Sequence, residues 1–198
     1  MRRDSLLFLA VGFAAGFAVL YFMTKQREPQ IVNATPSRLE LPSGPGAGPQ
    51  APEASAPPVD MAQVKELQDK IKANPKDYDA IVGLANIHFD QRNFSDAADL
   101  YIKALALKDN PDVRTDLGTM LFYSNRYDEA ITELRKVLAA NSTHAQALFN
   151  LGVVQLHGKN DSAGALQTWE KLIQTNPDFP QKAVVDEQIK ALKETLKK

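Results

Sequence analysis

Residues 59–198 show the apolar spacing of amphipathic helices, in which apolar side chains recur at three- and four-residue steps and short polar turns interrupt them. The pattern repeats along the chain. Three equivalent pairs stand 33 and 34 residues apart: Leu84-Ala85, Leu117-Gly118 and Leu151-Gly152. A fixed period of this length is typical of stacked helix pairs, which bury their apolar faces against their neighbours.

A second set of positions recurs in the latter half of each unit. Ala97, Ala130 and Ala165 stand 33 and 35 residues apart, and we expect the extra residue to lengthen a turn at 157–161. A large apolar residue follows each alanine, and another apolar residue comes one turn later. These residues are Tyr101, Leu134 and Trp169, and then Ala104, Val137 and Leu172. Small residues let two helices approach closely and large ones fill the space between units, so these positions are the predicted core.

Candidate helix ends accompany these positions. Ser95, Asp128 and Ser162 stand at the expected starts of the second helices, where a side-chain oxygen can accept hydrogen bonds from free backbone N–H groups. Pro111 and Pro177 stand where second helices are expected to end, because proline cannot continue a helix. The sequence therefore predicts helix pairs joined by short turns.

The recurring positions resemble the tetratricopeptide repeat, a helix–turn–helix unit of about 34 residues. Three units match, at 78–111, 111–144 and 145–178. The resemblance implies a packing role for Leu84, Ala85, Ala97, Tyr101, Ala104, Leu117, Gly118, Ala130, Leu134, Leu151, Gly152, Ala165, Trp169, Leu172 and Pro177. The family's first-helix tryptophan is absent from all three units, and its tyrosine is replaced by His88, Leu121 and Gln155.

The resemblance implies an all-α fold, a right-handed solenoid of about three repeats with a helix on either side. The stretch 59–74 resembles the second helix of a degenerate repeat, with Val64, Leu67 and Ile71 on one face. The stretch 181–198 is expected to form a capping helix with a polar outer face. We therefore expect about eight helices in one domain at 59–198.

Residues 5–23 form an uncharged apolar run after a four-residue tail at 1–4. As a helix this run extends about 28 Å, close to the thickness of a bilayer hydrocarbon core. The alternative is a cleaved signal peptide, but the run is longer than usual and no small-x-small cleavage site directly follows it. We expect a retained single-pass signal-anchor in the inner membrane, with the repeat domain in the periplasm.

Residues 24–58 differ in composition from both neighbours and contain eight of the twelve prolines and three glycines. Such a segment has too little apolar surface to offset the entropy lost on ordering. We expect it to be a disordered linker, or locally polyproline II, between the membrane helix and the repeats.

Charge and composition argue against several classes of function. The 23 basic and 24 acidic residues nearly cancel, so we expect no nucleic-acid partner. The chain has no cysteine, and His88, His144 and His157 fall in different units, so we expect no metal site. No glycine-rich phosphate loop and no convincing acid–base pair stands out. We therefore expect neither an enzyme nor a cofactor.

A binding surface follows from the resemblance, because the family's first helices line a concave groove that receives a protein or peptide. The implied groove residues are Asn86, Phe89, Asp90, Thr115, Thr119, Phe122, Tyr123, Phe149, Asn150, Val153 and His157. The alternative for Phe89, Phe122 and Phe149 is core packing between repeats. Members that clamp a carboxylate share a pattern of lysine, arginine and asparagine, of which only Asn86 is present here.

The leading prediction is a membrane-anchored scaffold that binds a protein or peptide. A narrower alternative rests on 165–172, Pro177 and 184–192, which are similar to the end of the periplasmic repeat subunits of cytochrome c maturation. Those subunits hold the apocytochrome for haem attachment. A further alternative is an assembly factor for a cell-envelope complex.

Overall fold

The computed structural model describes residues 58–197. The predicted tail at 1–4, the predicted membrane helix at 5–23 and all but the last residue of the predicted linker at 24–58 lie outside that range. Among the described residues, every helix is too short or too polar to cross a bilayer.

The described part of the chain is built from helices alone, which confirms the all-α prediction for these residues. It holds eight α-helices and one π-helical turn. In chain order these are α2 (Met61–Ala73), α3 (Tyr78–Asp90), α4 (Phe94–Leu107), α5 (Pro111–Tyr123), α6 (Tyr127–Ala140), α7 (Ala145–Val153), η1 (Val154–Gly158), α8 (Ser162–Thr175) and α9 (Lys182–Thr195).

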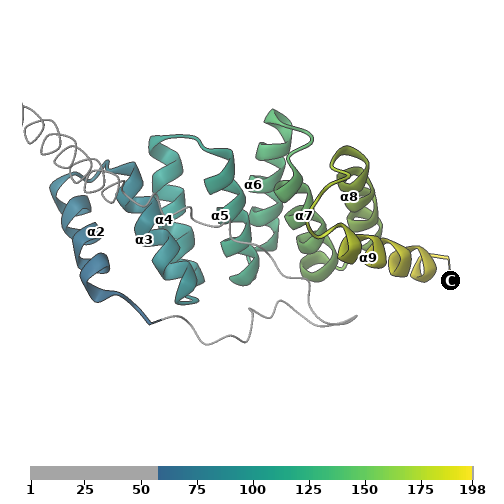
Figure 1. The fold of residues 1–198 in the computed structure, drawn as a ribbon, viewed down its shortest axis with the longest axis horizontal. Coiled ribbons are helices and arrows are strands. Elements are labelled where there is room, and N and C mark those ends of the chain that lie inside the picture. The colour runs from purple at the N-terminus through teal and green to yellow at the C-terminus, as the bar shows by residue number, and fades with distance from the viewer. Residues whose placement is uncertain (1–57, 198) are drawn as a thin grey trace, which may run out of the picture. The chain divides into compact units, whose positions relative to one another are not determined.

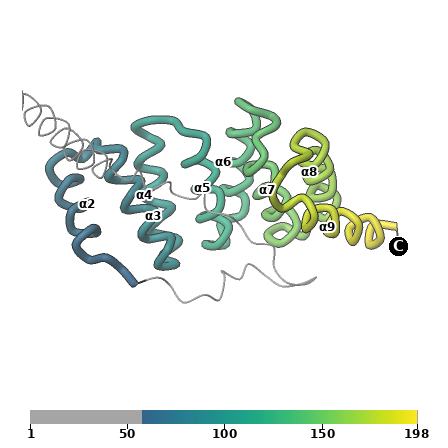
Figure 2. The backbone as a smooth tube through the Cα atoms, in the orientation of Figure 1, coloured from purple at the N-terminus to yellow at the C-terminus, as the bar shows by residue number. Residues whose placement is uncertain are grey.

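Helices that follow one another in the chain also lie side by side, so the elements stack in sequence order (Figure 1). Helices α3 and α4 form the first pair, α5 and α6 the second, and α7 and α8 the third. The smooth trace shows α9 lying across the last pair rather than along it (Figure 2). Each helix therefore buries its apolar face mainly against its sequence neighbours, as stacked repeats do.

The same three-residue turn joins the two helices of every pair. Its middle residue has positive φ in all three cases: Arg92 (60°), Asn125 (59°) and Asn160 (54°). The expected longer turn at 157–161 is wrong, because the third turn is as short as the others. The extra residue instead widens the end of the first helix into the π-helical turn η1. A backbone hydrogen bond from the Asp161 N–H to the Gln155 carbonyl spans the turn that follows.

The predicted caps of the second helices are also corrected. Helix α4 begins at Phe94 and α6 at Tyr127, so Ser95 and Asp128 lie inside these helices. Neither helix has a side-chain hydrogen bond at its N-cap. In the third pair Asp161 is the cap, one residue before Ser162, and its carboxylate accepts from the Gly164 N–H at 2.8 Å.

The packing positions form the core. All of those predicted from the repeat are buried except Pro177, which is exposed two residues beyond the end of α8. A Cβ added to Gly152 would lie closer than 3.0 Å to the indole of Trp169, so the first and second helices of this pair approach as closely as glycine allows. The Trp169 Nε1–H donates to the buried carbonyl of Phe149 at 3.1 Å.

The two end helices close the stack differently. Helix α2 has no buried residue, and Val64, Leu67 and Ile71 are half-buried on one face of it. Helix α9 buries Val185 and Leu192 and exposes most of its polar side chains. A terminal helix with a polar outer face ends the row of apolar contacts.

Candidate partner-binding surface

The structure divides the predicted groove residues into a buried and an accessible group. The accessible or half-buried group is Asn86, Phe89, Asp90, Tyr123 and His157. The buried group is Thr115, Thr119, Phe122, Phe149, Asn150 and Val153, each at most 2 % exposed. The buried side chains do not face a partner in this structure, so the prediction is corrected for them. For Phe122 and Phe149, core packing is the reading that the structure supports.

A chain of hydrogen bonds pairs the buried polar side chains among the predicted groove residues. The Asn150 side-chain amide of α7 donates to the Thr119 hydroxyl of α5 at 3.0 Å, and its carbonyl accepts from Gln146 at 2.8 Å. The Thr119 hydroxyl in turn donates to the Thr115 carbonyl at 3.3 Å. A buried amide with such partners joins two first helices and stabilises the stack.

The aromatic member of the third repeat is covered from the C-terminal side. Phe149 lies 5.5 Å from Phe179, measured between ring centroids, and Phe179 is only 8 % exposed. Phe179 belongs to the segment that leads from α8 into α9. The capping helix and its connection therefore remove this end of the predicted groove from solvent.

The accessible aromatic residues gather at the edge formed by the turns of the first two pairs. The rings of Phe94 and Tyr123 are stacked, with 4.7 Å between their centroids and 23° between their planes. The ring centroids of Phe89 and Phe94 are 6.1 Å apart, and all three rings are half-buried. We call Phe89, Phe94 and Tyr123 the aromatic edge. Phe89 and Tyr123 were predicted groove residues, whereas Phe94, the first residue of α4, was not.

A surface cavity of about 480 Å³ opens beside the aromatic edge. Phe94 and Tyr123 form part of its wall, and its polar lining residues include Arg92, Asp96 and Arg126. Arg126 donates two hydrogen bonds to Glu129, at 2.6 and 2.7 Å, and this bonding raises the pKa of Arg126. The cavity thus combines flat rings with charged residues of both signs, an amide and hydroxyl groups, which suits the side chains and backbone of an extended peptide.

The other accessible residues are Asn86, Asp90 and His157. Asn86 accepts a hydrogen bond from the buried Tyr101 hydroxyl at 2.5 Å, so one side of its amide is occupied. Asp90 ends α3 next to the first turn, and partial burial of its carboxyl raises the pKa of Asp90. His157 is half-buried in η1 of the third pair. The structure therefore brings Phe89, Asp90 and Tyr123 toward one edge and leaves His157 in a different repeat.

The part of the chain that the structure describes holds no group of three potential metal-ligating side chains. Some of its ionisable groups form ion pairs between different elements. Lys159 lies 2.8 Å from Asp128, and Arg114 contacts both Asp109 and Glu133.

Comparison with protein families identifies the family to which these stacked helix pairs belong. The tetratricopeptide repeat model matches residues 64–112 and 115–180, which is more than half of the chain. The chain belongs to the tetratricopeptide repeat family. The two matched ranges run from within α2 to the segment before α9.

One curated relative is the formate-dependent nitrite reductase complex subunit NrfG of Escherichia coli O157:H7. It is 31% identical to this tetratricopeptide repeat protein over 119 residues, which cover 58% of this chain and 60% of the relative. The chain thus matches about three fifths of that protein's length.

Solved structures with the same fold are less similar in sequence. PilF of Pseudomonas aeruginosa is 24% identical, with a TM-score of 0.57 over 69% of this chain and 63% of PilF. MamA is 23% identical, with a TM-score of 0.56 over 68% and 85% of the two chains. The first tetratricopeptide domain of Spaghetti, bound to an HSP90 peptide, is 17% identical, with a TM-score of 0.52 over 71% and 98%. These likenesses show the fold alone.

Proposed function

We propose that this chain is a non-catalytic scaffold that binds a peptide segment of a partner protein along the aromatic edge. Residues 5–23 hold the scaffold in the inner membrane, with the repeats in the periplasm. The observation that carries the proposal is the stacked pair of Phe94 and Tyr123 beside an open cavity, on a repeat surface whose other predicted contact residues are mostly buried.

The chemistry of the aromatic edge favours a peptide over a compact small molecule. The rings present flat apolar area whose ordering costs little entropy, because few torsions remain free. Arg92 and Arg126 offer planar donors for backbone carbonyls or carboxylates of the same segment. An extended segment could therefore contact rings through its side chains and arginines through its backbone.

A second candidate function is a role in cytochrome c maturation, in which the partner would be an apocytochrome or a component of haem attachment. Two observations favour it. The segment from Ala165 to Leu192 resembles the end of the periplasmic repeat subunits of that process, and the curated relative at 31% identity is a subunit of a nitrite reductase complex. The alternative is assembly of another cell-envelope complex. The identity of the crosslinked partner distinguishes it from cytochrome c maturation.

Site-specific crosslinking of the full chain in its native membranes tests the partner. A photo-crosslinking amino acid at Tyr123 is expected to trap a defined partner, identified by mass spectrometry, because this ring is accessible and borders the cavity. The matched control places the same amino acid at Gln68, which is exposed on α2. Haem-attachment proteins or an apocytochrome would support the second candidate, and secretin or pilus components would support envelope assembly. Equal products from both positions would contradict the proposed surface.

Protease accessibility tests the proposed placement in the membrane. With an epitope tag after Lys198, protease added to intact spheroplasts is expected to remove the tag, because the repeats would lie outside the cytoplasmic membrane. Deleting residues 1–24 is expected to move the protein from the membrane to the soluble fraction. A tag that stays protected until the spheroplasts are lysed would contradict the periplasmic orientation without affecting the crosslinking result.

A further inference from the structure

The first helix of the stack begins at the same side of the molecule as the aromatic edge. The Leu67 side chain of α2 packs on Gly83 of α3, where an added Cβ would lie 3.3 Å from it. The two helices run antiparallel, because they pack together and only the short connection at 74–77 joins them. Six helical residues extend about 9 Å, so Met61, the start of α2, is level with Phe89 near the end of α3.

Figure 1 agrees with this geometry. The start of α2 lies on one side of the stack, and the connection from α4 to α5 lies on the other side. The turn within each pair is at the opposite end of the helices from the connections between pairs. The chain that precedes α2 therefore enters the stack beside the aromatic edge.

This preceding part of the chain contains two Pro-x-x-Pro motifs that the scaffold function does not use. They are Pro42-Ser-Gly-Pro45 and Pro49-Gln-Ala-Pro52. Such motifs bind aromatic-lined grooves as polyproline II helices, in which the two prolines share one face about 9 Å apart. The second motif contains no glycine, so ordering its backbone costs less entropy. The motif at 49–52 is therefore the better ligand of the two.

The motif at 49–52 is close enough in the chain to reach every ring of the aromatic edge. Neighbouring helices lie about 8–10 Å apart, so three such steps from α2 to α5 amount to at most about 30 Å. As polyproline II, the residues from Pro52 to Pro58 extend about 19 Å, and those from Pro49 to Pro58 about 28 Å. A connection this short gives an effective concentration of about 1 mM, so even a weak contact is populated.

The aromatic edge has the composition that this mode of recognition requires. Phe94 and Tyr123 offer half-buried, stacked rings on which proline side chains can pack. Asn93 lines the same cavity and makes no side-chain capping bond to α4, so its amide can donate to a backbone carbonyl. A polyproline II segment has such carbonyls available, because it forms no internal hydrogen bonds.

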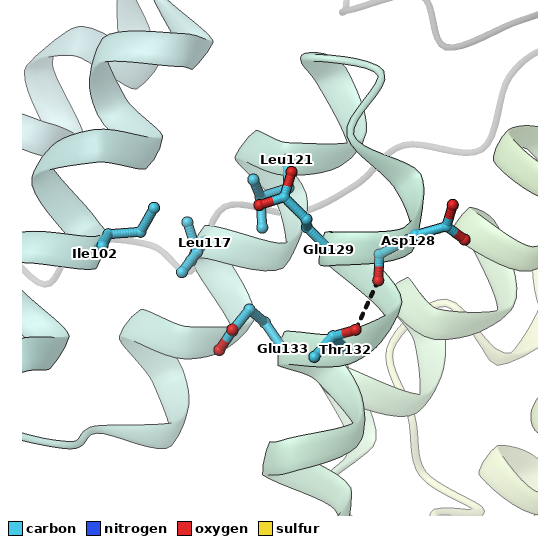
Figure 3. A pocket seen from close by; sticks show the side chains of 7 residues that line it. All are labelled: Ile102, Leu117, Leu121, Asp128, Glu129, Thr132 and Glu133. Carbon is cyan, nitrogen blue, oxygen red and sulfur yellow. Dashed lines mark hydrogen bonds between the residues drawn. The ribbon is translucent and has the colours of Figure 1, made fainter.

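A cavity elsewhere on the stack lacks these features. It lies between α4, α5 and α6, and Ile102, Leu117 and Leu121 supply its apolar surface (Figure 3). The rest of its lining is acidic or hydroxyl-bearing, and no aromatic ring borders it. Of these two surfaces, only the aromatic edge offers rings to a proline-rich segment.

We propose that the motif at 49–52 binds the aromatic edge of its own chain, with Pro49 and Pro52 packed on the rings of Phe94 and Tyr123. The inference rests on the proposed function in one respect, which is that a partner peptide must displace this motif. The affinity for the partner is then reduced in proportion to the fraction of chains in which the edge is unoccupied. The motif thus sets the threshold at which the scaffold binds its partner.

Intrachain crosslinking of the purified full chain in a non-ionic detergent tests the contact. A photo-crosslinking amino acid at Tyr123 is expected to give products that map by mass spectrometry to residues 46–55. The matched control places it at Gln68, which is exposed on α2 and nearer to the motif along the chain. Tethering alone would favour position 68, so equal yields from both positions would overturn the proposal. A yield that rises with protein concentration would assign the contact to a second copy and would also overturn it.

A pair of double variants identifies the motif. Pro49→Ser with Pro52→Ser is expected to reduce the product from position 123 to the level seen from position 68. Pro42→Ser with Pro45→Ser is the matched control and is expected to leave that product unchanged. All four positions precede the described helices, and far-UV circular dichroism checks that both variants are folded. Equal yields from the two double variants would contradict the assignment to 49–52.

A peptide titration tests the same contact without altering the aromatic edge. A fluorescent peptide of residues 47–54 is followed by anisotropy against the wild-type chain and against the variant with serine at 49 and 52. The variant is expected to bind it at least about threefold more tightly, because its own segment no longer competes. Equal affinity for both chains would overturn the proposal.

These measurements use no partner protein, so they separate this inference from the proposed function. Loss of the intrachain product would leave partner crosslinking from Tyr123 in native membranes as the test of the scaffold function. Absence of a partner there would leave the intrachain contact standing.

Discussion

Replacing Trp169 by alanine is expected to lower the free energy of unfolding by about 3–5 kcal/mol, the usual cost of emptying a large buried aromatic site. Trp169 is fully buried between the helices of the third pair, against Gly152. Its indole also donates a hydrogen bond to the Phe149 carbonyl, and the substitution would remove this bond. Loss on this scale is a large part of the stability of a domain of this size.

Urea unfolding followed by far-UV circular dichroism measures this change. Fluorescence is unsuitable, because Trp169 is the only tryptophan of the chain. Trp169→Phe is expected to lie between wild type and Trp169→Ala, since it keeps part of the ring and loses the N–H donor. The neighbouring exposed residue supplies the control, and Glu170→Ala is expected to change stability by less than about 1 kcal/mol. Similar losses for Trp169→Ala and Glu170→Ala would refute the packing role of the indole.

A series of glycine-to-alanine substitutions is expected to rank by the space that the structure leaves at each site. At Gly152 the added Cβ would meet the rigid Trp169 ring closer than 3.0 Å, and at Gly118 it would lie 2.8 Å from Leu134 Cγ. Overpacking of this kind costs about 1–3 kcal/mol. It therefore exceeds the gain of about 1 kcal/mol that alanine brings to a helix. Both substitutions should destabilise, Gly152→Ala more than Gly118→Ala, because Leu134 can rotate and the indole ring cannot.

Gly83→Ala is the matched control of this series, because its Cβ would lie 3.3 Å from the mobile end of Leu67 on the half-buried helix α2. This substitution is expected to be neutral or stabilising. Urea midpoints of the three variants, measured together, give the ranking. A loss at Gly83 as large as the loss at Gly152 would contradict the view that close approach to the second helix, rather than helix propensity, decides the outcome.

Much of the fold was predictable because the repeat shows each packing position three times. A single Leu-Gly pair indicates little, but its recurrence with Ala97, Ala130 and Ala165 at a matching offset indicated helix pairs and their core. The family match confirms this identification. Burial of these residues follows from physics that acts locally, since apolar spacing and small residues act within one pair of neighbouring helices.

Helix ends were less predictable, because the turn depends on backbone geometry that many sequences can adopt. Arg92, Asn125 and Asn160 share a left-handed conformation, yet arginine gives no sequence signal for it. The inserted residue of the third repeat had two physical solutions, a longer loop or a wider helical turn. Keeping the three-residue turn preserves the approach of α7 to α8, and the structure therefore places the insertion in η1.

The binding surface shows most clearly which features the sequence determined and which depended on tertiary contacts. The recurring apolar and small residues determined by themselves that the chain forms stacked helix pairs with a defined core. Only the tertiary structure decided which first-helix residues remain accessible, because that depends on contacts between repeats. Asn150 is buried against the preceding pair, where it donates a hydrogen bond to Thr119. Phe149 is buried against Phe179 of the following segment. A surface cavity of about 320 Å³ lined by Ile102, Leu117 and Glu129 likewise arises where α4, α5 and α6 meet, and no single stretch of sequence contains it.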